Sequence, residues 1–137
     1  MDPSAAAQPL PSPLVLVADD EPDCADNLAE LLRFVGYRVL VAYDGDTAVL
    51  ASLQHCPDAV VLDLHMPRMG GLAACSRIRQ QCSRGPVTLI ALTASGEAGH
   101  REAAELAGFD HYLVKPLMVG ALLNVLPPVP YEPLRHS

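Results

Sequence analysis

Five short runs of apolar, largely β-branched residues recur along the chain, and each predicts a β-strand. The first, third and fourth runs are apolar without alternation, which is typical of strands buried on both faces of a parallel sheet. Bounded by polar and turn-forming residues, the five runs span 14–18, 38–42, 59–63, 88–92 and 112–114.

The segments between these runs carry apolar residues at helical spacing. The first begins at Pro22, a residue suited to a first helical turn, and ends at Gly36 as a C-cap. Asp44 is the expected N-cap of a second helix that continues to His55. The regular alternation predicts a (βα)5 α/β fold, an open parallel sheet with helices on both faces. The remaining predicted helices span 71–83, 97–107 and 117–126.

Proline-rich segments flank this pattern at both ends. Four of the 13 prolines lie in residues 1–13 and four in residues 127–137. Such segments bury too little apolar surface to become ordered. We therefore expect one folded domain over residues 14–126 between two disordered tails.

Composition narrows the class of protein. The 137 residues carry a formal net charge of −7, which argues against direct contact with nucleic acid. The four cysteines lack metal-binding spacing and are expected to be reduced thiols. No apolar run is long enough to cross a membrane, and the N-terminus does not resemble a signal peptide, so we expect a cytoplasmic protein.

Open α/β sheets bind ligands at the carboxyl ends of their strands. The first strand delivers Asp19 and Asp20 to that edge, and the third delivers Asp63. The fourth strand delivers Thr93 and the fifth delivers Lys115. We expect three acids, one hydroxyl and one amine to converge there.

The cluster of acids is unfavourable when empty and favourable around a hard divalent cation such as Mg²⁺. The alternative is a solvated acidic loop at a helix N-terminus, where the helix dipole also favours carboxylates. Because Asp63 arrives on a separate strand, a metal site is the stronger interpretation. Lys115 is the only lysine of the chain and is predicted to neutralise a phosphate or a carboxylate. The sequence leaves open whether its bond to Pro116 is cis or trans.

Four motifs, VADDEPD, VVLDLHMPRMGG, LIALTAS and HYLVKP, resemble in order and spacing the receiver domains of two-component response regulators. The resemblance covers residues 14–126. It implies a CheY-like, flavodoxin-like sheet with strand order 2-1-3-4-5.

The resemblance also implies a mechanism. Asp63 would accept a phosphoryl group from a sensor histidine kinase or a histidine phosphotransfer protein. Asp20, Asp63 and the backbone carbonyl of His65 would hold Mg²⁺, and Asp19 would support the ion through water. Lys115 would neutralise the phosphoryl oxygens. The domain would be no enzyme beyond its own phosphorylation and dephosphorylation.

The same resemblance implies a switch and an output. Thr93 would bond the phosphate while Tyr112 turns inward, and His65 and Ser95 would tune dephosphorylation. A downstream protein would bind the surface formed by residues 97–107, 112–114 and 117–126. The apolar last helix is expected to leave an exposed strip that docks this partner, with the protein a monomer or weak homodimer. Surface or packing roles are expected for the other histidines: His55, His100, His111 and His136.

Alternative functions are less consistent with these residues. A phosphatase with an aspartate nucleophile needs a second acid two residues further on, where this chain has His65. An FMN carrier needs a hydroxyl- and glycine-rich loop after the first strand, where the acids would repel phosphate. Within the receiver family, we expect a stand-alone regulator, with the receiver of a hybrid histidine kinase as the alternative.

Overall fold

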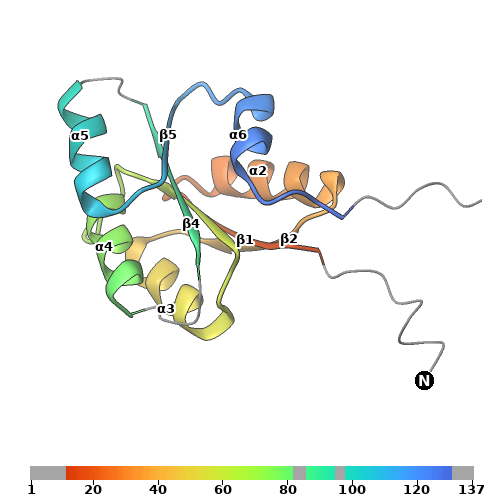
Figure 1. The fold of residues 1–137 in the computed structure, drawn as a ribbon, viewed down its shortest axis with the longest axis horizontal. Helices are drawn as coiled ribbons and strands as arrows, with labels where there is room; N and C mark the ends of the chain where they lie inside the picture. Colours follow the sequence, from red (N-terminus) through yellow and green to blue (C-terminus); the bar gives the residue numbers. More distant parts are fainter. Residues whose placement is uncertain (1–11, 82–85, 95–97, 131–137) are drawn as a thin grey trace, which may run out of the picture.

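The computed structural model describes residues 12–81, 86–94 and 98–130, which contain one parallel five-stranded sheet (Figure 1). Its order, β2-β1-β3-β4-β5, is the predicted one. The three central strands are buried almost throughout, as their continuous apolar sequences indicated. The strands are β1 (Leu14–Ala18), β2 (Arg38–Ala42), β3 (Ala59–Asp63), β4 (Thr88–Thr93) and β5 (His111–Val114).

Helices cover both faces of the sheet (Figure 1). The apolar residues of α2 and α6 pack on one face together with one set of strand side chains. Those of α3, α4 and α5 pack on the other face. The predicted doubly wound α/β fold is therefore confirmed. The helices span Pro22–Val35 (α2), Gly45–His55 (α3), Gly71–Gln81 (α4), Ala98–Ala107 (α5) and Val119–Val125 (α6).

The predicted helix signals act at the expected positions. Pro22 is the first residue of α2, and Gly36 ends this helix at a φ of 125°. The amide of Gly36 donates to the carbonyls of Leu32 and Arg33. The side chain of Asp44 caps α3 by accepting from the amide of Thr47 at 2.7 Å. Local sequence thus determines where these two helices begin and end.

The last helix differs from its prediction. It spans only 119–125, and its apolar side chains do not form the expected exposed strip. Leu122 and Leu126 are buried in the core shared with α2, and Leu123 packs against that core. A helix of two turns has few apolar positions, and here most of those side chains pack against the sheet and α2. Substitution of Leu123 would therefore test core packing rather than partner docking.

The residues that follow α6 lie against the folded body. The hydroxyl of Tyr37 donates to the carbonyl of Pro127 at 2.6 Å, and Val129 packs against the core on the α2 face of the sheet. These contacts involve the first residues of the predicted C-terminal tail. The domain boundaries at 14 and 126 stay predictions, and residues 82–83 and 97 of the predicted helices lie outside the described residues.

Candidate phosphoacceptor site

Two acids lie at the carboxyl edge of the sheet on neighbouring strands. Asp19 follows β1 directly, and Asp63 is the last residue of β3. Since Ala18 pairs with Leu62, the two acids stand at the same level. Only 3% of Asp19 and 5% of Asp63 is exposed, whereas Asp20 faces solvent. The predicted convergence of the acids is present in the structure.

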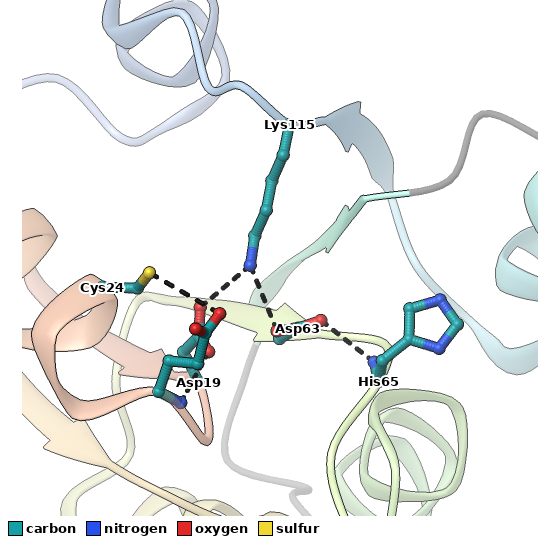
Figure 2. Close-up of polar contacts among 6 residues, drawn as sticks. Asp19, Cys24, Asp63, His65 and Lys115 are labelled. Carbon is teal, nitrogen blue, oxygen red and sulfur yellow. Dashed lines mark hydrogen bonds and ion pairs between the residues drawn. The ribbon is translucent and has the colours of Figure 1, made fainter.

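The ammonium group of Lys115 bridges the two buried acids (Figure 2). Its Nζ atom lies 3.2 Å from Oδ2 of Asp19 and 3.2 Å from Oδ2 of Asp63. The lysine follows β5, and its backbone amide donates to the carbonyl of Thr93 at 2.7 Å. The Lys115–Pro116 bond, which the sequence left open, is cis.

Backbone amides hold the other oxygen of each carboxylate. The amide of Glu21 donates to Oδ1 of Asp19, and the amide of His65 donates to Oδ1 of Asp63, both at 3.0 Å. Each acid therefore has one oxygen bound to the loop that follows it and one oxygen turned toward Lys115. The carboxylates are oriented before any ligand arrives.

Burial and charge shift the acid–base behaviour of the site. The pKa of Asp63 is raised, first by desolvation and then by the charge of Asp19, against the lowering effects of the His65 amide and Lys115. Desolvation acts to lower the pKa of Lys115. The hydrogen bond to Asp19 and the charges of both carboxylates outweigh it, so the pKa of Lys115 is raised. The lysine is thus held in its charged form.

The acids form a group that could hold a metal ion. Asp19, Asp20 and Asp63 each offer one carboxylate oxygen, and these oxygens lie within 4.8 Å of one another. Hard divalent cations prefer such oxygen ligands. The donor set therefore fits a cation of the Mg²⁺ or Ca²⁺ class.

Gly71, at the start of α4, allows the helix to approach the end of β3 closely. A Cβ atom at this position would lie 2.5 Å from the carbonyl oxygen of Asp63 and 2.8 Å from Cα of Leu64. Any larger residue would displace the end of β3. The glycine belongs to the VVLDLHMPRMGG motif, but its role was not predicted, because the close approach depends on tertiary structure.

The remaining predicted residues lie around this centre. Thr93 is fully buried at the end of β4, and Tyr112 is half-buried on β5. The imidazole of His65 is exposed, and its ring centroid lies 5.5 Å from that of His100 on α5. This contact was not predicted: His100 was expected to have only a surface or packing role, since nothing in its local spacing indicates a neighbour 35 positions earlier in the chain. Ser95 lies outside the described residues.

Comparison with known proteins identifies the family. The family model for the response regulator receiver domain matches residues 15–126. The transcriptional regulatory protein PrrA of Mycobacterium tuberculosis is 38% identical over 112 residues, covering 82% of this chain and 47% of PrrA. The chain thus spans about half the length of the curated relatives it matches. Because these relatives are named as transcriptional regulators, they lend no support to the expectation that nucleic acid is not contacted.

Solved structures give the same result. The receiver domain of a Pseudomonas aeruginosa sensor histidine kinase, with magnesium coordinated in its active site cleft, is 33% identical with a TM-score of 0.76. The match covers 83% of this chain and 93% of that one. A Burkholderia pseudomallei response regulator with a phosphorylated aspartic acid and a calcium ion is 27% identical with a TM-score of 0.77, covering 84% and 66%.

No helix within the described ranges is long and apolar enough to cross a membrane. The strand order, the acidic edge with its bridging lysine and the match over 15–126 agree. This chain belongs to the response regulator receiver domain family of two-component systems.

Proposed function

We propose that the chain is a phosphorylation-controlled switch in which Asp63 accepts a phosphoryl group. The donor is the phosphohistidine of a sensor histidine kinase or of a histidine phosphotransfer protein. The observation that carries the proposal is the position of Lys115, whose ammonium lies 3.2 Å from the Oδ2 oxygens of both Asp63 and Asp19. This arrangement provides a nucleophilic oxygen beside a fixed positive charge.

The geometry supports the following proposed transfer. Oδ2 of Asp63 attacks the phosphorus, a P–O bond forms, and the P–N bond to the donor imidazole breaks with its electron pair left on nitrogen. The His65 amide keeps Oδ1 in place during the attack. Lys115 neutralises the oxygens of the arriving phosphoryl group, so the protein contributes chiefly by positioning and by charge stabilisation.

Mg²⁺ is the proposed cofactor. Asp20, Asp63 and the carbonyl of His65 would hold the ion, with Asp19 in support, and bound Mg²⁺ supplies positive charge for the phosphoryl oxygens. The oxygen donors within 4.8 Å of one another support this assignment. The Pseudomonas receiver domain, with magnesium in its cleft, supports it as well.

The proposed switch joins the phosphoryl group to an output surface on α5, β5 and α6. Thr93 would bond the phosphate, and Tyr112 would turn inward. Three large apolar residues on or beside these elements are strongly or partly exposed, which suits a protein partner: Leu106 at 83%, Val114 at 42% and Met118 at 72%. Met118→Asp, on the exposed side chain, is the variant that tests docking there.

The biological setting stays a proposal. We propose a stand-alone regulator, monomeric or weakly dimeric, that catalyses only its own phosphorylation and dephosphorylation; the receiver of a hybrid histidine kinase is the alternative. The curated relatives are about twice as long, and PrrA is named as a transcriptional regulatory protein. A second alternative is therefore a longer protein in which a further domain binds DNA. The cytoplasmic location stays a prediction, and so does the role of Ser95 in dephosphorylation.

The test is intact mass after incubation with acetyl phosphate, with and without Mg²⁺. We expect one added phosphoryl group in the wild type with Mg²⁺ and none in Asp63→Asn. Asp46→Asn, on the exposed first turn of α3, is the matched control and should be labelled like the wild type. A Mg²⁺-dependent adduct that persists in Asp63→Asn would assign the acceptor role to another residue.

A further inference from the structure

His65 and His100 bring two distant parts of the site into contact. His65 lies on the loop after β3, two residues beyond Asp63, and His100 lies in the first turn of α5. Their ring centroids are 5.5 Å apart and the ring planes are inclined by 60°. The distance lies within the range of aromatic ring pairs, and the two rings are tilted rather than stacked face to face.

The position of His100 on α5 explains the direction of its side chain. Ala104, one helical turn later on the same face, is fully buried in the core. His100 therefore points toward the body of the domain, where the exposed ring of His65 meets it. The ring contact places the exposed imidazole of His65 against α5.

The backbone of His65 contacts Asp63, whereas its imidazole ring points away from Asp63. Its amide donates to Oδ1 of Asp63, while its imidazole extends away from that carboxylate (Figure 2). A change of side-chain rotamer, with the backbone bond kept, is the movement that would bring the imidazole toward a group on Asp63. The contact with His100 opposes this movement.

We propose that His100 is a positioning residue that holds the imidazole of His65 away from Asp63 and so prolongs the life of its phosphoryl group. The inference rests on the proposed function of Asp63. In hydrolysis, a water oxygen bonds to phosphorus, the bond from phosphorus to the Asp63 oxygen breaks, and its electron pair stays on the carboxylate. Both protons of the water end on the dihydrogen phosphate that is released. A released His65 imidazole would accept a hydrogen bond from this water and orient it for attack.

The experiment measures loss of the phosphoryl adduct by intact mass after acetyl phosphate is removed, in the presence of Mg²⁺. We expect His100→Ala to lose the group about two- to tenfold faster than the wild type, the ratio that corresponds to one aromatic pair. His100→Phe keeps a ring at the contact and should retain the wild-type rate. His55→Ala, an exposed histidine at the end of α3, is the matched control and should also be unchanged.

The double variant decides whether His100 acts through His65. His65→Ala with His100→Ala should lose the group at the rate of His65→Ala alone, since the ring that His100 restrains is then missing. If the double variant lost its phosphoryl group faster than His65→Ala alone, the inference would be overturned. An unchanged or slower rate in His100→Ala would overturn it too.

A spectroscopic measurement separates this inference from the proposed function. In the unphosphorylated protein, the imidazole ¹H–¹³C resonances of His65 should shift in His100→Ala and remain in place in His55→Ala. Unshifted resonances would overturn the contact. If the wild type took no phosphoryl group, the proposed function and the effect on its lifetime would both fail, while these resonances would still report the contact.

Discussion

The guanidinium group of Arg101 lies over the ring of Tyr112, 5.5 Å from the ring centroid. Arg101 belongs to α5 and Tyr112 to β5, so the contact joins the helix to the strand that it covers. A cation over an aromatic face at this distance is stabilised by about 0.5–1 kcal/mol at an exposed site. The contact favours the present orientation of Tyr112.

Arg101→Ala should make the proposed switch easier to activate. Without the cation, the present orientation of Tyr112 loses about 0.5–1 kcal/mol, so half-saturation with beryllofluoride should need about two- to fivefold less of this phosphoryl mimic. A titration followed by NMR measures the shift. Arg77→Ala, on the exposed side of α4, is the control and should match the wild type. An unchanged midpoint in Arg101→Ala would show that the contact does not restrain the switch.

Lys115→Met should destabilise the metal-free protein and increase its response to Mg²⁺. The substitution leaves two nearly buried carboxylates without their shared cation, at a cost of about 1–3 kcal/mol in the free energy of unfolding. Without the ammonium group, no positive charge repels a dication at the two carboxylates. Added Mg²⁺ should therefore raise the free energy of unfolding by more than it does in the wild type. Urea unfolding with and without Mg²⁺ measures both effects. A variant as stable as the wild type in chelator would contradict the charge-pairing role.

The raised pKa of Asp63 predicts a particular pH dependence of stability. The folded state holds this proton more tightly than the unfolded state, where the pKa is 3.8. The destabilising effect of the ionised group is therefore complete above the folded-state pKa and declines as pH falls toward 3.8. At neutral pH without metal, the urea midpoint of unfolding should be higher for Asp63→Asn than for the wild type. The difference between the two midpoints should decrease as the solution is acidified. If this difference in midpoint instead increased on acidification, pairing with Lys115 would outweigh desolvation in setting the pKa of Asp63.

Arg79→Lys should destabilise the fold and leave phosphorylation at the proposed site unchanged. The guanidinium of Arg79 donates to the carbonyl of Gly108 at 2.8 Å and to that of Val87 at 2.9 Å, and it pairs with Asp110. Lysine cannot reproduce this planar set of donors, so the free energy of unfolding should fall by about 2–3 kcal/mol. Urea unfolding tests this prediction, and labelling by acetyl phosphate should be kept. Loss of labelling in a folded variant would show that the contact also positions the acceptor.

The signals that predicted the fold and the charged edge of the sheet are local or follow from topology. Continuous apolar runs identified the buried strands, and Asp44 and Gly36 identified helix ends through bonds to their own neighbours. In a parallel sheet every strand ends at the same edge. The positions of Asp19 and Asp63 at the end of their runs were therefore enough to predict that they meet.

Contacts between side chains of separate elements depended on the tertiary structure. The sequence alone determined the alternation of strands and helices and the charged edge of the sheet, because both follow from periodicity and chain order. Only the tertiary structure decided that Lys115 bridges two acids, that His100 meets His65 and that α6 buries its leucines. The orientation of each helix against the sheet selects which of its side chains reach a neighbour, and that orientation is a property of the whole packed core.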